Sequence, residues 1–144
     1  MKLSLFCFLA IFIFSCNQKD GPVNTLKKYI DYRFSSEQSK EGILEKTTGK
    51  LHDYVSVLEG NTLDAFMKSR NVKKKKLSIK SKKCTEDICF ITYIVAYNHF
   101  SEGKNTFDIE VKKIAELRLI EDVWKIYDVN NVKTYMESKE ELAP

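Results

Sequence analysis

Cys84 and Cys89 are the residues whose types and spacing point most directly to chemistry. They flank the short segment Thr85–Ile88, and apolar and polar residues alternate on both sides of it, over 77–83 and 90–97. Such alternation is typical of β-strands, so the spacing predicts a β-hairpin closed by a disulfide between the two cysteines. The alternative is a pair of reduced or regulatory thiols.

A disulfide at this position predicts the register of the hairpin. With Cys84 opposite Cys89, Ile79 faces Ile94 and Leu77 faces Ala96, and we expect this apolar set to form the core face. A one-residue slip would turn that set outward. Because the closed loop is short, the bond contributes only about 2 kcal/mol to stability.

Thr92, Lys113 and Asp128 are polar residues at positions whose neighbours in the same strand pattern are apolar, and Trp124 shares their predicted face. If Phe100 faces Asn105 across the next turn, Thr92 faces Lys113, and Lys113 is diagonal to Asp128. A Lys–Asp pair inside a pocket could bind a polar ligand or act as acid and base. The alternative is a hydrated ion pair beyond the helices, which contributes little. Neither His52 nor His99 joins this set, so we assign no catalytic residue and expect no enzymatic activity.

The N-terminus carries a third chemical signal, at Cys16. Residues 1–15 are a short basic start and an apolar run, and polar residues follow Cys16. The run is too short to span a bilayer but fits a signal peptide. Ser15–Cys16 resembles the bacterial lipoprotein signal, which implies that Cys16 is lipidated (palmitate) and becomes the mature N-terminus. The alternative is an ordinary secretory signal with an incidental cysteine.

This interpretation places the protein outside the cytoplasm, tethered to a bacterial membrane on its periplasmic face or at the cell surface. Cys7 would leave with the signal peptide, so Cys84 and Cys89 remain as an even pair in an oxidising setting. Removing residues 1–15 removes one cation, Lys2, and leaves 23 Lys and Arg against 20 Asp and Glu. That small excess gives no reason to expect nucleic acid as a partner. Two cysteines without further ligands do not predict a metal site, and we expect no cofactor.

The remaining sequence predicts one α+β domain over 22–136, after a tether at 16–21 and before a flexible tail at 137–144. Apolar residues spaced three and four apart predict a helix over Pro22–Phe34. Three shorter helices follow, over residues 35–45, over 51–58 and from Asn61 onward. Four antiparallel strands then form a meander, the last two over 106–120 and 123–129.

Short helices before a meander of long strands, with the ending Trp124–Val129, resemble the nuclear transport factor 2-like superfamily. The resemblance covers about Pro22 to Val132. It implies a curved sheet wrapped around the helices, often with a pocket between them. Exported members are often lipoproteins, and others are isomerases and cyclases.

Three functions follow from these signals. The first is a membrane-anchored, non-enzymatic binding or interaction module. The second is a carrier or sensor of a small amphiphile held in the pocket, and the third is an isomerase- or cyclase-like enzyme. The superfamily often forms homodimers through the outer sheet face, and we expect an exposed row there: Ile91, Tyr93, Val95 and Tyr97.

Overall fold

The computed structural model describes residues 20–67 and 71–139. The predicted signal peptide, Cys7, Cys16 and most of the tether lie outside the described residues. Within these ranges four helices precede four strands: α1 (Pro22–Arg33), α2 (Lys40–Lys46), α3 (Gly49–Ser56), α4 (Gly60–Phe66), β1 (Val72–Cys84), β2 (Ile88–Ser101), β3 (Lys104–Ile120) and β4 (Val123–Ser138). The predicted α+β fold class is confirmed. None of the helices in the described ranges is long and apolar enough to cross a membrane.

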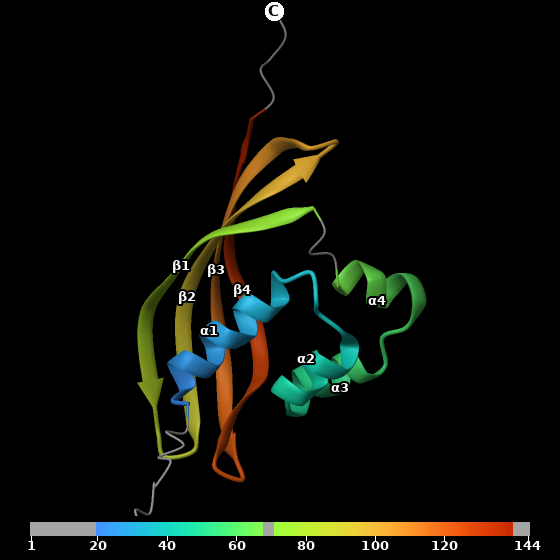
Figure 1. Cartoon of the computed structure of the whole chain (residues 1–144). Helices are drawn as coiled ribbons and strands as arrows, with labels where there is room; N and C mark the ends of the chain where they lie inside the picture. The colour runs from blue at the N-terminus through green and yellow to red at the C-terminus, as the bar shows by residue number, and fades with distance from the viewer. Residues whose placement is uncertain (1–19, 68–70, 140–144) are drawn as a thin grey trace, which may run out of the picture.

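The strands form one antiparallel sheet in the order β1-β2-β3-β4. The sheet is twisted and bent, α1 lies across one of its faces, and α2, α3 and α4 lie to one side (Figure 1). β4 extends through Glu137 and Ser138, so the predicted tail boundary after Met136 is wrong. The N–H of Lys139 still donates to the carbonyl of Thr106, 2.9 Å away, which holds the strand end against β3.

The first and fourth helices begin within one residue of the predicted positions, whereas the second begins later and the third runs over Gly49–Ser56 instead of 51–58. Pro22 starts α1 at a position that needs no N–H donor, and Leu26, Tyr29 and Ile30 are its buried residues. The second helix starts at Lys40 rather than near Ser35, because Ser39 is its N-cap and accepts a hydrogen bond from Gly42 N–H at 3.0 Å. Ser35 instead donates its hydroxyl proton to the Tyr32 carbonyl at the end of α1.

Single-residue bulges decide which side of each strand faces the helices. Cys84 faces Cys89 as predicted, but a register shift between Ile79 and Ser81 leaves Lys80 as an extra residue. Ile79 therefore faces Tyr93 and not Ile94, and Leu77 faces Val95 and not Ala96. The predicted register is wrong beyond Lys80, because a bulge turns every later side chain to the other face.

A second bulge has the same effect in the next hairpin. Phe100 faces Asn105 as predicted, but His99 faces Phe107, which leaves Thr106 as the extra residue. Its hydroxyl donates to the His99 carbonyl at 3.1 Å and lies 3.0 Å from His99 Nδ1. Tyr93, rather than Thr92, thus faces Lys113.

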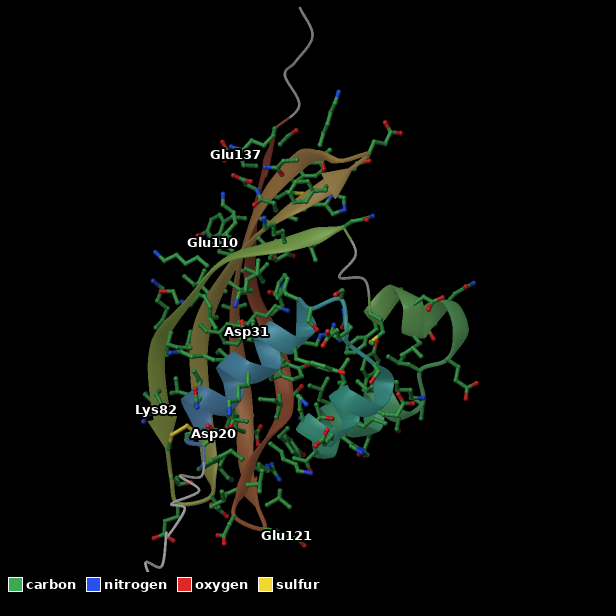
Figure 2. The ribbon with its side chains drawn as sticks, viewed as in Figure 1. Asp20, Asp31, Lys82, Glu110, Glu121 and Glu137 are labelled. Atoms are coloured by element: carbon green, nitrogen blue, oxygen red, sulfur yellow. A yellow bond between two sulfur atoms is a disulfide. The ribbon has the colours of Figure 1, made fainter. Side chains whose placement is uncertain are left out.

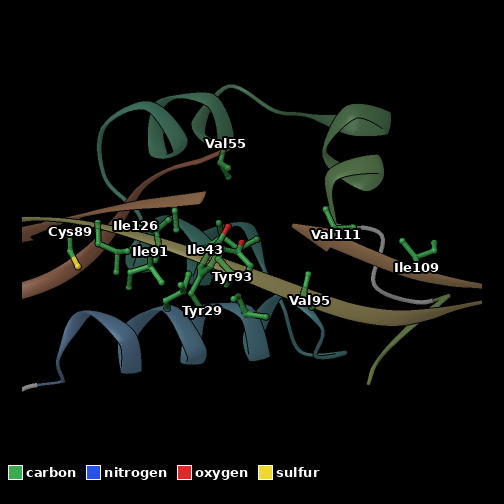
Figure 3. Packing of buried hydrophobic residues seen from close by; sticks show 14 residues of the cluster. Tyr29, Ile43, Val55, Cys89, Ile91, Tyr93, Val95, Ile109, Val111 and Ile126 are labelled. Atoms are coloured by element: carbon green, nitrogen blue, oxygen red, sulfur yellow. The ribbon is translucent and has the colours of Figure 1, made fainter. Parts of the chain in front are cut away.

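The core lies between the sheet and the helices, and its β2 residues are the set predicted to be exposed. Ile91, Tyr93 and Val95 are 0, 3 and 4% exposed. Figure 3 shows Ile91 and Tyr93 between β2 and α1, close to Tyr29. The predicted dimer surface through this row is therefore wrong, because helices already cover it. The other fully buried large side chains include Leu26, Ile43, Leu117 and Ile126.

Candidate functional site: a cationic pocket between α1 and the sheet

A cavity of about 500 Å³ lies between α1, α3, α4 and the buried face of the sheet. Most of its lining is apolar or aromatic. Its charged residues are Arg33 from α1, Lys50 from α3, Lys113 from β3 and Asp128 from β4. The volume falls within the range of roughly 300–1,000 Å³ that is common for small-molecule sites. The full lining is Tyr29, Ile30, Arg33, Phe34, Lys50, Leu51, Tyr54, Phe66, Val72, Tyr93, Val95, Tyr97, Lys113, Asp128 and Val129.

Arg33 is fixed at the end of α1 by Phe66. Its Nη2 donates to the Phe66 carbonyl at 2.8 Å, and its guanidinium lies 4.0 Å from the centre of the Phe66 ring. Its Nη1 is buried and has no hydrogen-bond partner among the described residues. Burial lowers the pKa of Arg33. One donor nitrogen of this guanidinium is therefore buried and uncompensated.

Lys113 is a second cation of the pocket, and among the described residues neither it nor Arg33 has an ion-pair partner. In the described part of the chain, no hydrogen bond or ion pair involves its ammonium group. Burial first, and then the positive charge of Arg33, lower the pKa of Lys113. Because an unpaired charge that is half-buried is costly, the pocket favours any anion that could pair with these two groups.

Asp128 does not supply that neutralisation. One of its oxygens accepts from Val129 N–H at 2.8 Å, and the other accepts from Asn130 Nδ2 at 3.1 Å. Lys50 Nζ lies 3.8 Å from the second oxygen. The carboxylate is therefore engaged within its own strand and by α3. The predicted direct pair between Asp128 and Lys113 is not formed.

Three tyrosines add neutral donors to the pocket wall. Burial raises the pKa of Tyr29, Tyr93 and Tyr97 above the ordinary tyrosine value, most strongly for Tyr93. Their hydroxyls therefore stay protonated at neutral pH. A protonated phenol can donate a hydrogen bond to an anion without adding a charge.

The structure separates the four residues that the sequence grouped. Lys113 and Asp128 line this pocket. Thr92 lies on the opposite face, because it alternates with buried Ile91 and Tyr93, so its predicted place in the pocket is wrong. Trp124 lines a different cavity of about 460 Å³, beside Asp20, Lys28 and the turn between β3 and β4. The bulge at Thr106 explains why Thr92 was misplaced, because it puts Tyr93 instead of Thr92 opposite Lys113.

Arg33 is the residue that the sequence analysis missed. It is the basic residue in the last turn of α1, four positions after Tyr29 and directly before Phe34. Its position at the border of the apolar stripe of α1 is one sequence feature that could have identified Arg33 as a pocket residue. That signal is weak, because basic side chains are common at helix C-termini.

The described residues hold no cluster of three or more His, Cys, Asp or Glu that could bind a metal ion. Among the residues that line the pocket, no nucleophile is paired with a base. The geometry is suited to binding a ligand, because two cations, several phenols and apolar side chains line one cavity.

No protein-family model and no curated protein matches this chain. Its fold is similar to that of a SEC-C motif containing protein from Rhodopseudomonas palustris, with a TM-score of 0.54 and 12% identity over 78% of this chain and 79% of that one. It is also similar to the intermembrane space region of the chloroplast protein ARC6, with a TM-score of 0.53 and 13% identity over 76% and 92%. A third solved structure is an Ntf2-like, potential transfer protein TraM from the Gram-positive conjugative plasmid pIP501, with a TM-score of 0.41 and 10% identity over 81% and 93%. At these identities the likeness concerns the fold.

Proposed function

We propose that this protein is a membrane-anchored, non-enzymatic binding module that holds a small amphiphile with an anionic head in the pocket. The observation that carries the proposal is the convergence of Arg33 and Lys113 on one cavity, with Arg33 Nη1 buried and unpartnered among the described residues. The single charge of a carboxylate would offset one of the two cations, and a doubly ionised phosphate would offset both. Hydrogen bonds to charged groups contribute about 1.5–3 kcal/mol each.

The rest of the cavity suits an apolar tail. Phe34, Leu51 and Val129 line it beside the ring of Tyr54. An inorganic anion would fill the charged part alone and leave these walls in contact with water. We therefore favour an amphiphile over a free ion.

The membrane tether and the superfamily are parts of the same proposal. The tether rests on the Ser15–Cys16 signal, and the nuclear transport factor 2-like assignment rests on the element order and the Trp124–Val129 ending. An exported module with an anchor would meet amphiphiles at the bilayer surface. An enzymatic role has less support, since Asp128 is engaged by Lys50 and Asn130 and no nucleophile with a base is among the residues that line the cavity.

Native mass spectrometry of the full chain, purified from its source membranes, tests for a retained ligand. Isothermal titration calorimetry then compares dodecanoate, dodecyl phosphate and uncharged dodecanol. We expect both anions to bind at least about tenfold more tightly than the alcohol, which corresponds to about 1.4 kcal/mol. Equal affinity for all three would contradict the anionic head.

Two substitutions and one control localise the binding. Arg33→Met and Lys113→Met should each weaken dodecanoate binding about tenfold or more. Lys112→Met is the matched control, because Lys112 is the exposed neighbour of Lys113 on the other face of β3. If the control weakens binding as much as Lys113→Met does, the ligand is not in this pocket.

Fractionation tests the anchor separately. Cys16→Ser should move the protein from the membrane to the soluble fraction and remove the mass of the attached lipid. A variant that still partitions fully with membranes, with unchanged mass, would refute lipidation without touching the pocket proposal.

A further inference from the structure

One edge of the sheet is covered over only part of its length. β4 is the last strand of the sheet, and Thr47 forms a parallel bridge with its Ile126. Thr48 N–H also donates to the Ile126 carbonyl at 2.8 Å. From Asn130 to Ser138 every residue is exposed, and no described strand pairs with the outer edge. An uncovered edge is a template for pairing with another strand.

This free edge carries like charges directly opposite one another on the outer face. Lys112 of β3 faces Lys133 of β4, and Asp108 faces Glu137. Opposed like charges destabilise a sheet. Lys139 and Lys75 partly compensate the acidic pair, at 3.6 and 3.3 Å from Asp108. Lys139 is also 3.0 Å from Glu137.

The basic pair has no such compensation. Within the described residues, no ion pair involves Lys112 or Lys133, and Lys133 Nζ lies instead 4.5 Å from the centre of the Tyr135 ring. Tyr135 is 54% exposed and separates the basic pair from the acidic pair. Glu110 and Glu137 lie on the part of the sheet that extends beyond α1, where no helix lies against the strands (Figure 2). The edge is therefore open to another chain.

We propose that a second copy of this chain pairs with this edge, antiparallel about a two-fold axis at Tyr135. In this register Lys133 faces Glu137 of the partner subunit, and Glu137 faces the partner's Lys133. The outer face then carries a row of Lys112, Lys133, the partner's Glu137 and the partner's Asp108. Both like-charged pairs gain opposite charges beside them.

The order of the side chains favours a second copy over an unrelated strand. The sequence Lys133, Tyr135, Glu137 on one face is complementary to itself when it is reversed. That is the property an isologous interface requires. The paired segment also begins after the bulge at Val132, so its ladder is regular.

The opposite edge of the sheet is a poor alternative partner for β4. β1 carries many lysines, and bulges interrupt it at Lys75 and Lys80. Lysines and bulges on an edge strand hinder edge-to-edge pairing. Head-to-tail assembly of β4 on β1 is therefore disfavoured, and β4 on β4 forms a closed dimer.

Sedimentation velocity of the full chain in detergent micelles, at about 100 μM, tests the proposal. We expect wild type to sediment as a dimer, since a two-strand contact falls among small interfaces that need such concentrations. Lys133→Glu and Glu137→Lys should each raise the dissociation constant about tenfold or more. Neither variant should unfold, because each places an opposite charge across from Lys112 or Asp108 in its own chain.

Mixing the two variants gives the decisive result. In a heterodimer of the Lys133→Glu chain with the Glu137→Lys chain, both cross-edge pairs become attractive again, so an equimolar mixture should dimerise. Lys82→Glu on β1 is the matched control and should leave the dimer unchanged. A monomeric wild type, a dimer that survives both reversals, or a mixture that stays monomeric would each overturn the proposal.

Discussion

Arg33 on α1 and Lys113 on β3 line the same cavity, and the charge of Arg33 adds to burial in lowering the pKa of Lys113. Two like charges share a partly desolvated space without a carboxylate between them. Such an arrangement costs stability in the free protein. The same arrangement makes the cavity selective for anions.

Lys113→Met should therefore stabilise the free protein while it weakens anion binding. The side chain keeps its approximate length and loses an uncompensated charge, so we expect the free energy of unfolding to rise by about 1 kcal/mol. Chemical denaturation with and without dodecanoate measures both effects. Lys112→Met is the control for binding and should leave dodecanoate affinity unchanged. A loss of stability in Lys113→Met would mean that its ammonium has a partner in the folded state.

The lowered pKa of Lys113 also predicts a dependence on pH. The unfolded chain holds this proton up to the ordinary lysine value near 10.5, whereas the folded chain releases it at a lower pH. The unfolded state then binds more protons, so stability rises with pH between the two values. Across this pH range the free energy of unfolding of wild type should rise relative to that of Lys113→Met. The affinity of wild type for dodecanoate should fall over the same range. Denaturation curves and calorimetry in buffers from neutral pH to about 10 check both trends.

Gly49→Ala should be strongly destabilising. Gly49 has φ +52°, and a Cβ there would lie 2.0 Å from the ring of Tyr127. Tyr127 cannot easily move, because the Arg118 guanidinium stacks 3.5 Å from its ring centre. We expect a loss of about 2–4 kcal/mol, combining backbone strain and overpacking.

Gly60→Ala separates the two causes of that loss. Gly60 has a similar φ of +49°, but nothing lies within 4 Å of the position that a Cβ would take there. This variant should lose only about 1 kcal/mol, the backbone cost alone. Equal losses at Gly49 and Gly60 in urea denaturation would show that Tyr127 yields to the added methyl group.

The disulfide between Cys84 and Cys89 should matter modestly for stability. Replacing both residues with alanine should cost about 2 kcal/mol, because the loop they close is short. The hairpin should keep its register, since Leu119 N–H donates to the Asp87 carbonyl at 2.8 Å and holds the loop against β3. Denaturation of the double variant and amide exchange in β1 and β2 measure these two effects. Loss of protection throughout β1 would contradict the second.

The sequence patterns predicted the order of the elements and the cysteine pairing, because both depend on local spacing. The register failed at Lys80 and Thr106, since a bulge leaves no mark in an alternating pattern when the extra residue is polar. The apolar residues of β2 also occur at both parities, with Ile94 and Ala96 beside Ile91 and Val95. The helices pack against the row that contains Ile91 and Val95, and this packing determines which row is buried.

Only the part of the pocket that depends on strand alternation could be predicted from the sequence. Lys113 lies on β3, whose parity was predicted correctly, and it lines the cavity. Arg33 comes from α1, and its approach to Lys113 depends on how the helix crosses the sheet. The spacing of residues within α1 or within β3 does not indicate how the helix crosses the sheet.

The bulge at Lys80 gives β1 one residue that the pairing with β2 does not need. Lys80 is exposed, and exchanging it for another side chain disturbs little. Deleting it would remove the bulge and still leave Ile79 opposite Tyr93 and Leu77 opposite Val95, because Lys80 is the extra residue of this pairing. Ser78 lies between these two residues and has a partner in the ladder, Ile94, so its deletion would turn either Leu77 or Ile79 away from the helices. Deletion of Ser78 should therefore be far more harmful than deletion of Lys80.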